Sequence, residues 1–137
     1  MKVFFDTNVY VAEALLGPTA IRLIAATQAA AWRIYSSEQV LDELQRVLGD
    51  VRGLSKRLAR LSRLRVLARA THVRLQASRH LVAGDPHDSP ILQVALQAGV
   101  DYLVTNDSVL LALDPYEGLR IISMTEYYEL LQNEGLL

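Results

Sequence analysis

The feature that most constrains the fold of this chain is a repeated alternation between short runs of strand-forming residues and longer helical segments. The short runs predict strands at 2–5, 32–35, 101–105 and 119–122, with an ambiguous segment at 72–75. Capping residues, prolines and glycines bound predicted helices at 8–16, 20–30, 38–48, 54–70, 88–99, 108–113 and beyond 123. Because strands that alternate with helices pair in parallel and need cover on both faces, we predict an α/β fold, a three-layer α/β/α domain with a central parallel sheet.

Length and composition fit a single domain covering residues 1–137, since 51% of the residues are hydrophobic and 21% are charged. The chain contains no cysteine, which excludes disulfides, thiolate zinc sites and a cysteine nucleophile. No apolar run approaches the ~20 residues that a membrane span requires, and Asp6 interrupts the first apolar run too early for a signal peptide. We therefore expect no membrane association and a cytoplasmic location.

The charges are distributed unevenly, although the net charge is only -1. Between Val51 and Gly84 there are nine basic residues and no acid, whereas the rest of the chain has five basic residues against fifteen acidic ones. The predicted helix at 54–70 lies in this basic segment and carries leucines at 54, 58, 61, 64 and 67, which we expect on one face. Its basic residues either form a solvated surface or bind the RNA backbone; the predicted phosphate contacts are Lys56, Arg57, Arg60 and Arg63.

Three aspartates occupy positions where functional residues gather in parallel sheets. Asp6 and Asp107 each follow a predicted strand, and the crevice of such a sheet lies beyond the carboxyl ends of its strands. Asp88 opens a predicted helix and projects toward the buried face of that helix. Each aspartate alone could be a helix cap, but together they predict a cluster of carboxylates.

Glu43 is the fourth candidate, because a helical wheel separates it from the other acids of its helix. Glu38 and Asp42 lie about 160° from the centre of the apolar stripe, whereas Glu43 lies about 100° away, at the edge of the stripe. From there a long side chain reaches a crevice while its stem stays packed. We therefore choose Glu43 and expect the other two acids to face solvent.

Carboxylates brought together repel one another, which raises their pKa values unless a cation intervenes. Oxygen ligands with positions left open for water suit Mg²⁺ or Mn²⁺. These ions lower the pKa of water and bind phosphate oxygens, which is the chemistry of phosphodiester hydrolysis. The sequence therefore predicts that Asp6, Glu43, Asp88 and Asp107 are both metal ligands and catalytic residues.

Four segments together resemble the PIN-domain family, in particular its branch of toxin components of toxin-antitoxin systems, the VapC-like ribonucleases. They are Phe5-Asp6-Thr7-Asn8-Val9-Tyr10, the surroundings of Glu43, Asp85-Pro86-His87-Asp88 and Asp101-Tyr102-Leu103-Val104-Thr105-Asn106-Asp107. The resemblance implies a metal-dependent endoribonuclease that uses the four acids, forms homodimers and has an antitoxin partner. Residues expected to support and orient these acids are Thr7, Asn8, Thr105 and Asn106. The chain departs from the branch at Ser89, where a further acid is frequent, and at Asn106, where glycine is frequent.

Other interpretations of the same pattern fit less well. A haloacid-dehalogenase-like phosphatase requires a second aspartate two residues after the first, where this chain has Asn8. A response-regulator receiver requires an acidic pair after its first strand and a lysine after its last, where this chain has Asp6 alone and Ser123. The remaining alternative is a catalytically weak PIN module that binds RNA or protein in RNA processing.

Overall fold

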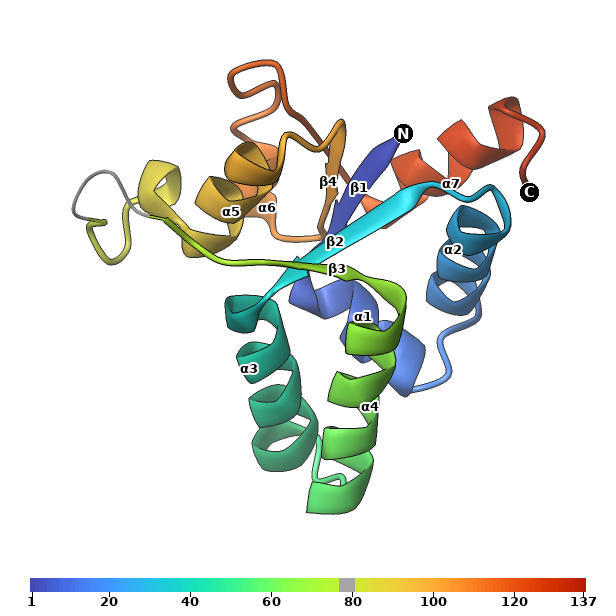
Figure 1. The fold of residues 1–137 in the computed structure, drawn as a ribbon, viewed down its shortest axis with the longest axis vertical. Coiled ribbons are helices and arrows are strands. Elements are labelled where there is room, and N and C mark those ends of the chain that lie inside the picture. The colour runs from blue at the N-terminus through green and yellow to red at the C-terminus, as the bar shows by residue number, and fades with distance from the viewer. Residues whose placement is uncertain (77–80) are drawn as a thin grey trace.

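The computed structural model describes residues 1–76 and 81–137, and these form the predicted α/β fold around one parallel sheet (Figure 1). The sheet has five strands in the order β3-β2-β1-β4-β5, and every neighbouring pair runs in parallel. The strands are β1 (Lys2–Phe5), β2 (Arg33–Ser37), β3 (Thr71–Val73), β4 (Tyr102–Val104) and β5 (Arg120–Ile122). The basic residue Arg79 lies outside the described residues.

The helices connect and cover these strands. They are α1 (Thr7–Ala14), α2 (Pro18–Ala29), α3 (Glu38–Arg46), α4 (Lys56–Arg69), α5 (Pro90–Ala98), α6 (Ser108–Leu111) and α7 (Met124–Asn133). A π-helical turn at Val47–Val51 extends α3, and a 3₁₀ turn at Pro86–Asp88 precedes α5. Figure 1 shows α5 and α6 on one side of the sheet and α2 and α7 on the other, so the three-layer prediction is confirmed.

The central strand β1 anchors the core. Val3, Phe4 and Phe5 are fully buried, because helices cover both faces of the sheet and strands flank β1 on both edges. The ring of Phe5 makes edge contacts with Tyr10 of α1 and Tyr127 of α7. The residue that follows β1 is therefore attached to the best-packed part of the molecule.

Most predicted boundaries shift by one to three residues, for physical reasons that the structure shows. The second strand extends to Ser37 and passes directly into α3, where the Ser37 hydroxyl accepts a hydrogen bond from the Val40 amide at 3.4 Å. The following α-helix ends at Arg46, because the chain continues as a π-helical turn. The ambiguous segment forms β3, an edge strand.

The predicted apolar face of the basic helix is wrong. Helix α4 packs against the core through the buried Ala59 and Val66, not through its leucines. Leucines three residues apart drift around a helix of 3.6 residues per turn, so they do not share one stripe. Leu54 precedes the helix and is partly buried, and the four exposed leucines, 41–51% accessible, are Leu58, Leu61, Leu64 and Leu67.

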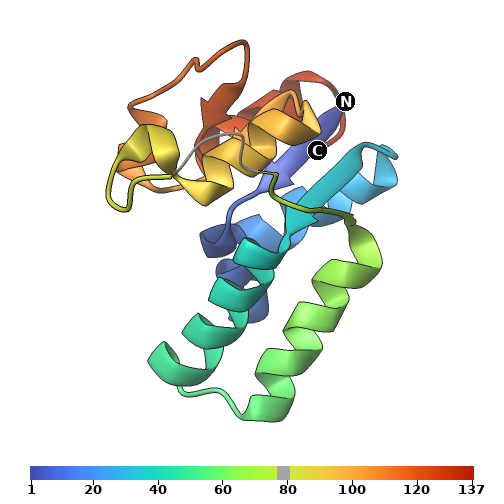
Figure 2. The same cartoon turned by 60° about the vertical axis from the view of Figure 1, so that its left-hand side comes forward.

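Helices α3 and α4 pack side by side and project together beyond the ends of the strands, as both views show (Figures 1 and 2). Arg63 of α4 forms ion pairs with Glu38 and Asp42 of α3, the second at 2.7 Å. Arg69 of α4 reaches in the other direction, to Glu13 of α1. These contacts hold the α3–α4 pair as one wall beside α1.

Within residues 1–76 and 81–137, no single helix has both the length and the apolar character to cross a membrane. Helices α1 and α2 reach the necessary length only when taken together, and they meet at an angle of 111°.

Candidate functional site: an acidic cleft at the ends of the strands

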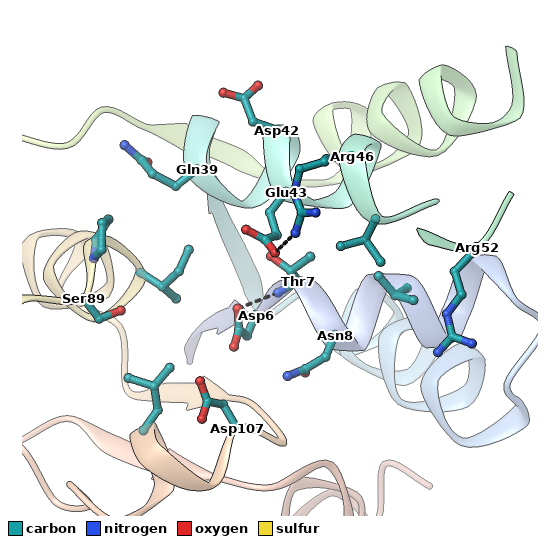
Figure 3. A pocket seen from close by; sticks show the side chains of 15 residues that line it. Asp6, Thr7, Asn8, Gln39, Asp42, Glu43, Arg46, Arg52, Ser89 and Asp107 are labelled. Atoms are coloured by element: carbon teal, nitrogen blue, oxygen red, sulfur yellow. Dashed lines mark hydrogen bonds and ion pairs between the residues drawn. The ribbon is translucent and has the colours of Figure 1, made fainter. Parts of the chain in front are cut away.

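A cleft of about 750 Å³ opens at the carboxyl ends of β1 and β4, where the sequence predicts the functional crevice (Figure 3). Asp6 directly follows β1 and caps α1, and Asp107 caps α6 after β4. Glu43 enters from α3. The polar and charged residues that line the cleft are Asp6, Thr7, Asn8, Gln39, Asp42, Glu43, Arg46, Arg52, Ser89 and Asp107.

A hydrogen-bond network fixes Asp6 at the base of the cleft. The Thr105 hydroxyl donates to Asp6 Oδ2 at 2.7 Å, and the Thr7 amide donates to Asp6 Oδ1 at 2.7 Å. The same hydroxyl accepts a hydrogen bond from the Asp107 amide at 3.0 Å and one from the Asn8 side chain at 3.4 Å. Thr105 thus links the two aspartates through a single buried oxygen.

Asn106 strengthens this connection between the strand ends. Its amide donates to Asn8 Oδ1 at 3.4 Å, and its side-chain oxygen accepts from the Met124 amide at 3.2 Å. The loop after β4 is therefore tied to α1 on one side and to α7 on the other.

The electrostatics of Asp6 show that the acids influence one another. Burial raises the pKa of the Asp6 carboxyl, and the hydrogen bonds from Thr105 and Thr7 lower it. The negative charges of Asp107 and Glu43 raise it further, and the net pKa lies above its ordinary value. Negative charge in the cleft is therefore only partly compensated by the protein.

Glu43 points into the cleft toward Asp6, whereas the neighbouring Asp42 points away from it (Figure 3). The Glu43 carboxylate is half exposed and accepts a hydrogen bond from Arg46 Nη2 at 2.8 Å. Asp42 is 67% exposed and pairs with Arg63. The direction that the helical wheel assigns to each acid agrees with this arrangement.

Asp88 is separate from the other three acids in this structure. It is buried on the 3₁₀ turn before α5, and its Oδ2 accepts a hydrogen bond from the Val82 amide at 3.0 Å. Its neighbour Ser89 lines the cleft and caps α5. The structure therefore brings together Asp6, Glu43 and Asp107 in the cleft, whereas Asp88 is buried and is not among the residues that line it.

The basic residues of the cleft differ from those predicted to bind RNA. Lys56, Arg57 and Arg60 are exposed on α4 outside the cleft, and the Arg63 guanidinium is paired with α3. The arginines that line the cleft are Arg46 and Arg52. Arg46 could have been found from its spacing, since a residue three positions after Glu43 shares its helix face.

The donor atoms suit a divalent cation, although the carboxylates are not gathered as ligands. Among residues 1–76 and 81–137, no three His, Cys, Asp or Glu side chains are close enough to hold a metal. Two buried oxygens of residues that line the cleft, Thr7 Oγ1 and Gln39 Oε1, have no hydrogen-bond partner in the described part of the chain. The fit to a cation rests on the carboxylates, because Mg²⁺ and Mn²⁺ prefer oxygen ligands and keep positions open for water. Asp6, Glu43 and Asp107 supply the negative charge for the cation.

A doubly wound parallel sheet with carboxylates at the carboxyl ends of its strands defines a class of α/β protein whose functional crevice lies there. Within this class the chain belongs to the PIN domain family, whose model matches residues 2–108. Members of this family are typically nucleases and typically depend on metal.

A solved structure supports the same fold. It is described as "Crystal structure of VapBC2 from Rickettsia felis bound to a DNA fragment from their promoter". One of its chains superimposes with a TM-score of 0.64 at 19% identity, over 90% of this chain and 98% of that chain. No curated protein matches the sequence significantly.

Proposed function

We propose that this protein is a metal-dependent endoribonuclease that hydrolyses RNA phosphodiester bonds with Mg²⁺ or Mn²⁺. The observation that carries the proposal is the convergence of Asp6 and Asp107, at the ends of β1 and β4, with Glu43 of α3 on one cleft in a PIN domain. These three residues are far apart in the sequence and come from different elements of the fold. Their meeting at one cleft is better explained by a common ligand than by helix capping, which accounts for Asp6 and Asp107 but not for Glu43.

Each residue has a distinct part in this proposal. The Thr105 hydroxyl holds the Asp6 carboxylate and the Val109 amide holds that of Asp107, so both would bind the cation in a fixed orientation. Glu43 is half exposed on α3 and has the freedom to close onto the ion. Asp88 is buried next to Ser89, which lines the cleft, and would join the set after a rearrangement of the 3₁₀ turn that carries it. A bound divalent cation supplies polarisation of phosphate oxygens and a more acidic water.

The first experiment is cleavage of labelled single-stranded RNA with Mg²⁺ or Mn²⁺. Wild-type protein is expected to cut, EDTA to stop the reaction, and Asp6→Asn to be inactive. Asp50→Asn is the matched control, because Asp50 is an exposed aspartate outside the cleft and the chemical change is the same. If wild type and Asp6→Asn cut equally, the activity comes from a contaminant. If wild type binds RNA without cutting it, the alternative of a binding module gains support.

We also propose that the protein is the toxin of a toxin-antitoxin pair. The structural neighbour is by its description a VapBC2 assembly, and helix α4 offers a surface for a protein partner. The four exposed leucines of α4 lie among basic residues, with no acid between Val51 and Gly84. Apolar side chains framed by positive charge suit an acidic amphipathic segment of another protein.

Co-expression tests the partner. The product of a small neighbouring gene is expected to relieve growth arrest caused by this protein and to co-purify with it. Replacing Leu61 and Leu64 by glutamine should weaken that association and leave RNA cleavage intact. Growth arrest that also disappears in Asp6→Asn ties the toxic effect to the cleft, whereas arrest that persists in this variant contradicts the toxin proposal.

A further inference from the structure

Two arginines line the acidic cleft. The proposed reaction needs positive charge there, because an RNA strand must be held by its phosphates as well as by the metal. Arg46 lies one helical turn after Glu43, and Arg52 follows the π-helical turn that extends α3. Figure 3 shows Arg46 beside Glu43 and Arg52 on the other side of Asn8. Both guanidiniums therefore border the space in which an RNA strand would pass the acids.

The π-helical turn explains why Arg52 reaches the cleft. Its amide donates to the Val47 carbonyl at 2.9 Å, five residues back, which closes the widened turn. The chain then turns toward α4 instead of continuing the axis of α3. Arg52 has no ion pair in the described part of the chain, so its positive charge is available to a ligand.

Arg46 differs because it already holds an anion. Its pair with Glu43 is half exposed on both sides, with side chains 55% and 50% accessible, and water weakens such pairs strongly. A divalent cation at Glu43 would displace the guanidinium easily. Arginine cannot lose its charge, so the released side chain would then be repelled by the cation and would need another anion.

We propose that Arg46 and Arg52 form the phosphate-binding wall of the cleft, and that Arg46 exchanges Glu43 for an RNA phosphate when a divalent cation binds Glu43. This inference rests on the proposed nuclease function. The planar guanidinium binds phosphate oxygens in a bidentate manner, which fixes the strand as well as attracting it. Arg46 thus neutralises Glu43 while the metal is absent and binds an RNA phosphate when the metal is present.

Titration with Mn²⁺, followed by electron paramagnetic resonance without RNA, tests the exchange. Arg46→Gln frees Glu43 and is expected to raise Mn²⁺ affinity several-fold. Arg52→Gln is the matched control, because it removes the same charge from the same cleft without breaking an ion pair, and it should have a smaller effect. Equal changes in the two variants would overturn the exchange, since they would reflect charge alone.

RNA binding tests the phosphate-binding wall. Fluorescence anisotropy of a labelled single-stranded RNA with hydrolysis-resistant phosphorothioate linkages is measured with Mn²⁺ present and all acids intact, at several salt concentrations. Arg46→Gln and Arg52→Gln should each weaken binding and lower the salt dependence by about 0.7 per lost phosphate contact. Arg33→Gln is the control, because β2 begins at Arg33 and the cleft lies at the other end of the strands. If both cleft variants bind RNA like the Arg33→Gln variant, the wall does not exist.

Failure of the inference and failure of the proposed function give different results. If wild-type protein cuts RNA and the arginine variants match Arg33→Gln in RNA binding, only the inference is wrong. If wild-type protein does not cut RNA with any divalent cation, the proposed function is wrong, whatever the arginines bind.

Discussion

The Thr105 hydroxyl donates a hydrogen bond of 2.7 Å to the Asp6 carboxylate while it accepts one from the Asp107 amide. Thr105 is fully buried, so this one oxygen orients the Asp6 carboxylate and fixes the backbone of Asp107, which follows a different strand. Removing it is expected to disturb the ligands without touching the ligand atoms themselves.

Thr105→Val should therefore weaken the binding of Mn²⁺ by about 10-fold to 100-fold, the usual effect of losing a residue that orients a metal ligand. The loss of the buried hydrogen bond should also lower the free energy of unfolding by about 1–3 kcal/mol. Isothermal titration calorimetry measures the first effect and urea unfolding the second. Thr105→Ser keeps the hydroxyl and should retain most of the affinity; a serine variant as weak as the valine variant would argue against this role.

The raised pKa of Asp6 predicts a pH dependence of stability in the absence of metal. The folded chain keeps a proton on Asp6 at pH values where the unfolded chain, with its ordinary pKa of 3.8, has lost it. The free energy of unfolding therefore falls as the pH rises from about 4 through the raised pKa, and it is not regained above that pKa. Asp6→Asn lacks this loss, so its stability relative to wild type should be higher at pH 7 than at pH 3.

Urea unfolding in EDTA at a series of pH values measures this difference. Added Mn²⁺ should make wild type more stable than Asp6→Asn at neutral pH. A ligand at 100 times its dissociation constant stabilises the folded state by about 2.7 kcal/mol. Only wild type should gain this stabilisation. A stability difference between wild type and Asp6→Asn that does not change with pH would contradict the raised pKa of Asp6.

The Glu13–Arg69 pair predicts a large cost for removing one partner. Arg69 Nη1 and Nη2 lie 2.5 and 2.7 Å from the two Glu13 oxygens, and the side chains are only 14% and 9% accessible. Glu13→Ala would leave the guanidinium without its partner and should cost about 3–5 kcal/mol of unfolding free energy. The double variant Glu13→Leu, Arg69→Met should recover most of this loss in the same urea unfolding experiment. If both variants are equally unstable, packing and not charge accounts for the cost.

The exposed leucines of α4 predict the opposite behaviour. Leu61 is 44% accessible, so Leu61→Gln should change the free energy of unfolding of the isolated protein by at most about 0.5 kcal/mol. Leu44 of α3 is fully buried, and Leu44→Ala should cost about 2–5 kcal/mol. Thermal unfolding of both variants makes the comparison. A large destabilisation by Leu61→Gln would mean that this leucine is buried in the protein in solution, for example between two copies.

The sequence predicted the elements of the fold well because the buried strands and the helix caps are local signals. Ser123 and Glu126 form a capping box at the start of α7, where the sequence predicts a helix, and Asp6 and Asp107 lie where the ends of β1 and β4 put them. Parallel pairing follows from the alternation of elements and needs no knowledge of distant contacts.

What the sequence did not predict depends on packing between distant segments. The leucine spacing of α4 indicated a core face, but α4 packs, mainly against α3, through the small side chains of Ala59 and Val66 instead. The position of Asp88 depends on a bond to Val82 across a loop, which no periodicity reveals. The route of Arg52 into the cleft depends on a π-helical turn, which has no simple sequence signature.

The position of β1 also sets the order in which the molecule can be completed. Lys2–Phe5 is synthesised before the strands that flank it, and β1 obtains its second neighbour only from Tyr102–Val104, after β2 and β3 have been made. While the chain is still being made, Asp6 and Glu43 are present but Asp107 is not, and the central strand has one open edge. The acids of the proposed metal site therefore come together only after Asp107 has been synthesised and β4 has paired with β1.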